Sequence, residues 1–455
     1  MPVSVVDINL SASTGATAKP TYNDIALIGH ATTAPSVGFN NGKRYSNPDD
    51  VANNFGDGSD VHVASQALTE MGVESWVVAV AEELTESSVS LGGDTTSTDR
   101  VNIKDTNSNH LPLHDDLSAT SVYVDGTEKT VVPKTESPPD VNETPANDEA
   151  FVNFDTGEIV TGTTTSGSGP GITADYHHLD WSSLETELEP LGIDLFTLAD
   201  TRCKREHIGN LNELVTFASS IDAAVVGAHM NGAEAATDAE AMELAHEVAG
   251  YVPSGDLMMI AHKSSEDVAS YVAGQLGVNP AWFDPFWDGE GYPFSTDFYR
   301  RTLVGDPGTT ETFEGGDSDG NGPSNAIISV DGTLVLSNSL TTAGSSSDYQ
   351  YLDVGRTESF IGSEVEEALK SLRLDNDQVP FTNNGRSQLL GAIRGRLQQY
   401  VGSNNAPLSE LEVTAPTIDQ LSDADKANRV FSGITVEGTL ANNIHEFGVE
   451  LNVRV

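Results

Sequence analysis

The last hundred residues carry the most regular alternation of apolar and polar positions in the chain. From Phe447 onward every second residue is apolar, which predicts a strand with one apolar face. That face consists of Phe447, Val449, Leu451, Val453 and Val455. Burying five such side chains would contribute roughly 7–15 kcal/mol before the cost of ordering the chain. We therefore expect this strand to be covered, either within its own subunit or at the sheet edge of a neighbouring subunit.

A second alternating segment lies near the other end of the chain. Its apolar positions are Val3, Val5, Ile8 and Leu10, with a change of phase after Val5 of the kind that a β-bulge produces. Residues 11–18 are rich in Ser, Thr, Gly and Ala, a composition typical of a flexible tether. Two interpretations stay open: both segments are edge strands of one domain, or both are arms that link subunits.

Between these segments, short buried strands alternate with helix patterns, which predicts an α/β fold with a mostly parallel, helix-covered sheet. Strands are expected at 24–29 (closed by Gly29), 76–80, 193–198, 223–227 and 257–261. Helices are expected at 48–55, 211–219, 238–248 and 265–276. A hairpin is expected at 327–336, around Asp331 and Gly332.

The composition divides the chain into parts, giving an α+β fold overall. Residues 86–182 are rich in Thr, Ser, Asp, Gly and Pro, with short strand patterns, and predict a small all-β domain inserted into the α/β core. Helices are expected at 358–372 and 386–401, followed by a strand pair at 433–440 and 444–455. The predicted parts are an N-terminal arm (1–20), core (21–85), inserted β-rich domain (86–182), core (183–345), C-terminal assembly domain (346–443) and linking strand (444–455).

The chain is strongly acidic, with 69 acidic and 22 basic residues and a net charge of −47. Such self-repulsion destabilises a compact fold in dilute salt, whereas in multimolar salt the Debye length is about 3 Å or less. We interpret the charge as adaptation to a salt-saturated cytoplasm; disorder, the other explanation, is opposed by the regular apolar patterning.

The charge is also unevenly distributed. Residues 356–455 carry only −5 of the total, so we expect the C-terminal part to contact other protein. Basic residues are nowhere clustered enough to follow phosphates, and nucleic acid is not an expected partner. We find no secretory leader pattern and no apolar run of membrane-spanning length, so we expect cytoplasmic synthesis and no direct membrane insertion.

The sequence contains no recognisable catalytic arrangement. His110 and His114 are separated by Pro112, which opposes a helical metal site, and the single cysteine, Cys203, has no partner for a disulfide within the chain. Asp317, Asp319 and Asn321 resemble the opening of a calcium loop, but Ile328 stands where the bidentate acid should be. A solvated acidic turn is the favoured interpretation, and cation binding there is left open. We predict no enzymatic activity, no cofactor and no metal.

Segments near both ends resemble the contractile tail sheath proteins of myovirus-like phages and related contractile injection systems. At the start these are the apolar strand at 25–31, the Tyr-Ser element at 45–51 and the Phe-Gly-x-Gly-Ser turn at 55–59. Towards the end they are the Arg-Thr helix entry at 351–361 and the glycine-led strand and small-residue corner at 429–445. Residues 86–182 and 307–323 match no pattern of the family.

The resemblance implies a sheath of stacked hexameric rings around an inner tail tube, which contracts to drive the tube through the host cell envelope. The implied partners are further copies of the chain, a tail tube protein, and baseplate and tail terminator proteins. The implied location is a virion, assembled in the host cytoplasm at high salt; with the acidity, this suggests a haloarchaeal virus. A cellular injection device is the other possibility that the sequence leaves open.

In such an assembly both arms would add to sheets of neighbouring subunits. The cations expected to face the tube or a neighbour are Arg373, Arg386, Arg394, Arg396 and Arg429, although each also fits a solvated surface residue. Two other functions remain as alternatives: another virion or surface-lattice protein, such as a tube or capsid subunit, and a halophilic α/β enzyme.

Overall fold

The computed structural model describes the greater part of the chain. The described residues are 24–31, 34–92, 99–103, 113, 120–134, 144–154, 157–162, 171–199, 208–230, 242, 245–246, 249–285, 291–293, 297–299, 313, 322–344, 347–376, 378–402 and 406–441. Both predicted arms, 1–20 and 444–455, lie outside these residues. So do His110, His114, Cys203, Asp317, Asp319 and Asn321, and most of the helix predicted at 238–248.

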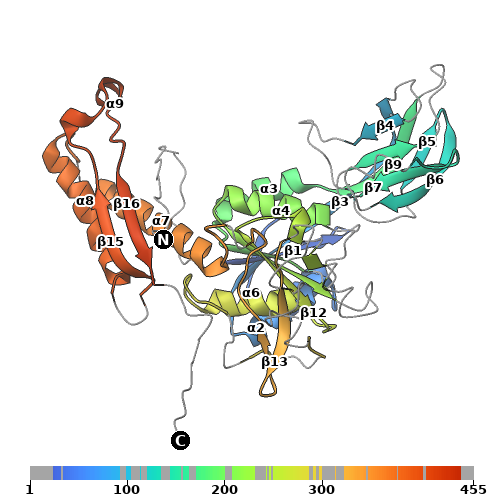
Figure 1. Ribbon diagram of the computed structural model, residues 1–455, viewed down its shortest axis with the longest axis horizontal. Helices are drawn as coiled ribbons and strands as arrows, with labels where there is room; N and C mark the ends of the chain where they lie inside the picture. The colour runs from blue at the N-terminus through green and yellow to red at the C-terminus, as the bar shows by residue number, and fades with distance from the viewer. Residues whose placement is uncertain are drawn as a thin grey trace, which may run out of the picture.

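The core is a large, mostly parallel sheet, as the sequence predicts (Figure 1). Six neighbouring strands are parallel. In sheet order they are β13 (Asn325–Val330), β12 (Leu257–His262), β11 (Ala224–Met230), β10 (Leu195–Leu198), β1 (Ile25–Ala31) and β3 (Trp76–Gly92). Two short strands pair antiparallel with this set: β14 (Thr333–Leu336) with β13, and β2 (Lys43–Tyr45) with β3. The predicted hairpin around Asp331 and Gly332 is therefore confirmed.

Helices cover both faces of this sheet because alternate strand residues are apolar on each side. On one face Ile25 and Leu27 pack with α1 (Pro48–Phe55), α2 (Asp60–Glu70) and α6 (Val268–Val278). On the other face Ala26 and Ile28 pack with α3 (Trp181–Leu188) and α4 (Ile208–Ser220), and a 3-10 turn, η1 (Glu189–Leu191), follows α3. A strand buried on both faces is typical of a parallel sheet. No helix in the described part of the chain is both long and apolar enough to span a membrane.

Local sequence explains where the first elements begin and end. The Asn47 side chain accepts a hydrogen bond from the Asp49 amide, and Pro48 occupies the first turn, so α1 starts where the sequence predicts. Gly29, by contrast, does not end β1, which continues to Ala31. A Cβ atom at residue 29 would lie 2.6 Å from Cγ1 of Val61, so glycine there permits α2 to pack closely on the strand.

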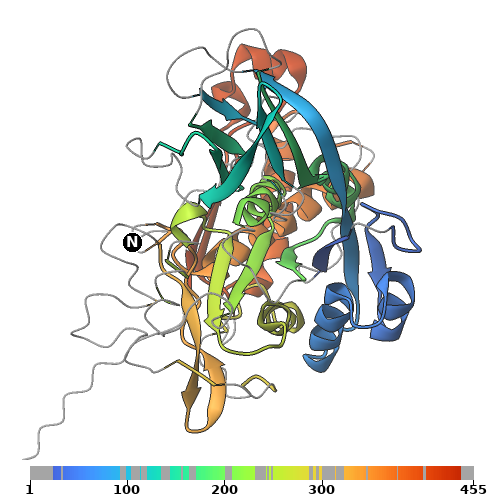
Figure 2. The ribbon, with the colours of Figure 1, turned by 90° about the vertical axis from the view of Figure 1, so that its right-hand side faces the viewer.

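A long two-stranded ribbon leads from the core to the β-rich part of the chain. β3 continues well beyond the predicted 76–80 and pairs antiparallel with β9 (Ile172–Leu179) as far as Gly92, a course that Figure 2 shows from the β-rich end. The further strands are β4 (Asp99–Asn102), β5 (Ser121–Val124), β6 (Thr127–Lys134), β7 (Glu149–Asn153) and β8 (Glu158–Thr161). Val122, Val152 and Ile159 belong to a separate apolar core of these strands.

The C-terminal part lies at the opposite end of the molecule from the β-rich strands (Figure 1). Two long antiparallel helices, α7 (Leu352–Asp375) and α8 (Asn383–Leu397), support a two-stranded sheet. The remaining elements are η4 (Gln398–Tyr400), β15 (Leu408–Thr414), η5 (Ile418–Gln420), α9 (Asp423–Asn428) and β16 (Thr435–Leu440). α7 begins six residues before the predicted 358, because Leu352 at its start packs into the core of the parallel sheet.

Candidate assembly interface

The two-stranded sheet of the C-terminal part has one apolar and one polar face. β15 and β16 are antiparallel, and Leu408, Val413 and Val436 lie on the apolar face. They pack against apolar side chains of both helices: Ile361, Val365, Leu390, Ile393 and Leu397. The strand pair predicted at 433–440 and 444–455 stays a prediction, because 444–455 lies outside the described residues; within them β16 pairs with β15, which was not predicted from the sequence. A register shift between Leu408 and Glu410 interrupts the alternation that would have identified it.

The polar face of this sheet carries only glutamate and threonine. Alternation places Glu410, Glu412 and Thr414 of β15, and Thr435, Glu437 and Thr439 of β16, on this side. Glu412 lies directly opposite Glu437, and both are exposed. Like charges in directly opposed positions destabilise a strand pair. This face therefore favours a cation at Glu412 and Glu437.

The two edges of the sheet differ. The edge of β15 is partly occupied, because Val401 forms a parallel bridge with Leu408 and the Gly402 amide donates to the Leu408 carbonyl at 2.9 Å. β16, within the described residues, pairs with β15 alone. An edge strand with free backbone groups is a template for a further strand.

Three of the five predicted interface arginines make contacts within the subunit. Arg386 donates to the carbonyl oxygens of Ala415 and Pro416, and Arg394 donates to that of Val413. These bonds attach α8 to the end of β15 and to the segment that follows it. These carbonyls belong to residues 19 to 30 positions away, so the bonds leave no signal in the local sequence.

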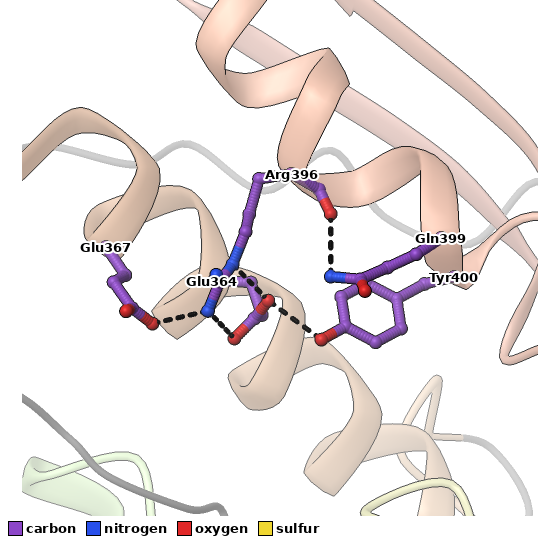
Figure 3. Close-up of polar contacts among 5 residues, drawn as sticks. All are labelled: Glu364, Glu367, Arg396, Gln399 and Tyr400. Atoms are coloured by element: carbon purple, nitrogen blue, oxygen red, sulfur yellow. Dashed lines mark hydrogen bonds and ion pairs between the residues drawn. The ribbon is translucent and has the colours of Figure 1, made fainter. Parts of the chain in front are cut away.

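Arg396 binds two glutamates of the neighbouring helix (Figure 3). Its Nε lies 2.6 Å from Oε2 of Glu364, and its Nη2 lies 3.0 Å from Oε1 of Glu364 and 2.6 Å from Glu367. The Tyr400 hydroxyl donates to Oε2 of Glu364 at 2.9 Å. Glu364 is 8% exposed. The paired bonds to Glu364 raise the pKa of Arg396, and burial, with the Glu364 bond, raises the pKa of Tyr400 to about 12.

Arg373 and Arg429 are exposed. Arg373 is in the last turn of α7, and Arg429 ends α9 in the left-handed conformation, with φ of 57°. The predicted role of all five arginines at the tube or a neighbour stays a prediction. The same holds for Val3, Val5, Ile8, Leu10, Phe447, Val449, Leu451, Val453 and Val455, which lie outside the described residues.

The C-terminal part is attached to the core by contacts that the sequence analysis did not identify. Arg356 of α7 is buried, and its Nη2 donates to the Leu276 carbonyl in the last turns of α6, at 3.1 Å. A cation at that end of a helix interacts favourably with the helix dipole. Trp282, which follows α6, contacts both Phe360 of α7 and Tyr400 of η4. The sequence shows that Trp282, Phe360 and Tyr400 are aromatic, but residue type does not specify which rings are in contact.

The described residues offer no metal site: among them, no group of three or more His, Cys, Asp or Glu side chains could hold an ion. Histidines and glutamates meet in pairs at the start of the β3–β9 ribbon, where Nδ1 of His177 lies 2.6 Å from Glu83 and Nε2 of His178 lies 3.9 Å from Glu86.

No protein-family model matches this sequence, and no curated protein matches it either. Solved structures do match in three dimensions. A chain of the cryo-EM structure of the anti-feeding prophage baseplate, 6-fold symmetrised, superposes with a TM-score of 0.55 at 13% identity, over 99% of this chain and 98% of that one. A chain of the same baseplate in the contracted state gives 0.54 at 9% identity, again over 99% and 98%.

A chain of the anti-feeding prophage helical sheath in the contracted state superposes with a TM-score of 0.52 at 13% identity, over 99% of this chain and 98% of that chain. The chain therefore shares its fold, over nearly its full length, with proteins solved in contractile baseplate and sheath assemblies.

Proposed function

We propose that this protein is the structural subunit of a contractile sheath, polymerising as stacked hexameric rings around an inner tail tube. Contraction of the polymer would drive the tube through the envelope of a target cell. The observation that carries the proposal is the full-length correspondence in fold with a chain of a helical sheath. A shared core alone would be weaker support, because one α/β core hosts many functions.

The polar and apolar pattern of both chain ends supports the same function independently. Apolar alternation at 447–455 and at 3–10 fits strands that add to a neighbour. Residues 11–18, which connect the segment 3–10 to the core, fit a tether that absorbs movement. The acceptor would be the β15–β16 sheet, since β16 has an edge with no partner strand in the described residues. Subunits joined by such strands would stay linked through a large rearrangement.

In the proposed sheath, the C-terminal part and the β-rich part of the chain would face opposite directions. Residues 346–443 would form the inner layer, in contact with the tube and with neighbouring subunits, and residues 86–182 would project outward. The proposed partners are further copies, a tail tube protein, and baseplate and terminator proteins, in the tail of a virion or a related device. The net charge of −47 supports assembly in a salt-rich cytoplasm, as in a haloarchaeal host.

The proposal is tested by sedimentation of the purified full chain in about 3 M salt, where charge repulsion is screened within about 3 Å. We expect polymer that pellets at high speed, either from the chain alone or after addition of the tube protein from the same particle. A chain that stays monomeric under both conditions contradicts the proposal.

A further inference from the structure

Asp24, the residue before β1, is bonded on both its backbone and its side chain. Its amide donates to Oδ2 of Asp194 at 3.1 Å, and Nη1 of Arg44 donates to its Oδ1 at 2.6 Å. Its carbonyl oxygen accepts from the amides of Asp194 and Leu195, at 3.0 and 3.1 Å. Asp24 is 7% exposed and Asp194 is 1% exposed. These bonds converge on the residue at which the chain enters the middle of the parallel sheet.

Arg44 extends this arrangement to the other side of β1. It belongs to β2, which pairs with β3, and its Nη1 also donates to Oγ of Ser75, the residue before β3, at 3.1 Å. Asp194 is likewise the residue before β10. Because β10 and β3 are the two neighbours of β1, the starts of three adjacent strands are bonded together here. We call Asp24, Arg44 and Asp194 the entry cluster.

The C-terminal part is attached to the core at the same edge of the sheet. The Thr342 amide donates to the carbonyl of Leu257, the first residue of β12, at 2.9 Å. Tyr349 lies beside Gly255, since a Cβ atom at residue 255 would be 2.7 Å from its own Cβ. The strands from β12 to β1 are parallel, so they all start along this edge. The β-rich part leaves from the opposite edge, where β3 continues beyond β1 to pair with β9 (Figure 1).

The direction of a pulling force decides which hydrogen bonds resist it. A force between the start of β1 and the C-terminal part would act along one edge of the sheet, across the strands, and would peel β1 away from its first residue. During peeling the evenly spaced bonds of a parallel ladder break one after another, whereas a force along the strand is shared among them. The entry cluster lies where peeling would begin.

We propose that the entry cluster anchors β1 against tension applied through the chain that precedes it. The inference rests on the proposed sheath, in which residues 3–10 join a neighbouring subunit, and goes beyond it by naming the core residues that resist the tension. Arg44 is the residue to change, because 45% of its side chain is exposed. Without it Asp24 keeps its three bonds to Asp194 and Leu195, so the core should still fold.

Single-molecule unfolding of the full chain at constant force tests the anchor. One handle is attached at the N-terminus and the other at Asp348→Cys, in a Cys203→Ser background; Asp348 is exposed and adjoins Tyr349 at the edge of the entry cluster. Arg44→Ala should raise the unfolding rate of the core about threefold to tenfold, because a charge-assisted bond that resists peeling is lost.

Lys43→Ala is the matched control. It removes the same charge from the same strand, but Nζ of Lys43 lies 5.1 Å from the centre of the Tyr45 ring, and Asp24 bonds to Arg44 instead. The unfolding rate of this variant should equal that of the parent chain. An Arg44→Ala chain that unfolds no faster than Lys43→Ala would overturn the proposal.

A second attachment point distinguishes anchoring from a general contribution to stability. Ser265→Cys in the Cys203→Ser background moves the handle to the opposite edge, because the exposed Ser265 follows the end of β12, and the force then acts along β1. Here Arg44→Ala should change the rate less than about twofold, since the ladders share the force. Equal acceleration in both geometries would overturn the anchor. The sheath itself is tested apart, by pelleting of the wild-type chain, which does not depend on these rates.

Discussion

The ring of Trp282 lies 5.5 Å from that of Phe360, measured between centroids, and the two planes are inclined by 58°. Trp282 belongs to the segment after α6 of the core, and Phe360 belongs to the helix that carries the C-terminal part. Tyr400 completes the contact, 6.0 Å from Trp282 and 5.0 Å from Phe360. The three rings join the parallel-sheet core to the proposed assembly domain.

Replacing Trp282 by alanine should therefore loosen the C-terminal part without unfolding the core. Two aromatic contacts are lost, and we expect a loss of about 1–3 kcal/mol in the stability of that part. Hydrogen exchange should show faster exchange in α8 and β15, with β11 and β12 unchanged. Phe298→Ala, which removes an aromatic ring that is 48% exposed, serves as the control and should change neither region. Hydrogen exchange that became faster throughout the chain would contradict the claim that Trp282 stabilises only the contact between the core and the C-terminal part.

Removing the Arg396 side chain should destabilise the pairing of α7 and α8. Arg396→Ala leaves the largely buried carboxylate of Glu364 with the Tyr400 hydroxyl as its remaining partner of those shown in Figure 3, which we expect to reduce stability by about 1–3 kcal/mol. Lys370→Ala is the matched control. Lys370 binds Glu366 at 2.9 Å, and both residues lie on the exposed side of α7, the helix that also carries Glu364. Such an exposed pair contributes less than about 0.5 kcal/mol. If urea denaturation showed that both variants lose the same free energy of unfolding, the larger contribution expected from the Arg396–Glu364 pair would be refuted.

Stability should fall in alkaline solution partly through Tyr400. Its pKa is raised from 10.0 to about 12 by burial and by the bond to Glu364. Below pH 10 the hydroxyl is protonated in both folded and unfolded chains, so its contribution is fully present there. Between about pH 10 and 12 the unfolded chain releases this proton first, and the contribution is lost as pH rises. Tyr400→Phe should therefore lose less stability than the wild type over this pH range. If the free energy of unfolding fell equally with pH in both chains, Tyr400 would not be the group responsible.

Deleting residues 444–455 should abolish polymerisation while leaving the globular subunit folded. The reason is that the described core contains both faces of the parallel sheet and the helices that cover them without this segment. Replacing Val449 and Val453 by serine should have a similar effect, because it removes part of the apolar face. Glu450→Gln with Asn452→Ser alters the opposite face and should leave polymerisation intact. A deletion variant that forms normal polymer would exclude the linking role.

The strength of local patterns determined which elements were predictable. α1 combines a capping asparagine with proline in the first turn, and the strands of the core are continuous apolar runs, so both were located from sequence. The outer half of β3 is polar and follows from its pairing with β9, which is distant in sequence. α9 has no buried residue and hence no apolar stripe.

The candidate interface was predictable only in part. Arg386, Arg394 and Arg396 lie in a helix where the sequence predicts one, but their partners within the subunit were not predicted. Arg386 binds a carbonyl 29 residues away, and Arg396 binds a glutamate 32 residues away. Such contacts depend on how α7, α8 and β15 pack, which periodicity alone does not specify. The alternation at 447–455 remains the basis for the proposed linking strand.

The central claim is most directly tested by negative-stain electron microscopy of the purified full chain in about 3 M salt, where charge repulsion is screened. We predict hollow tubes or stacked rings of uniform diameter, with sixfold symmetry in end views. If the chain requires a partner, the same structures should appear on adding the tube protein. Dispersed single subunits under both conditions would contradict a sheath.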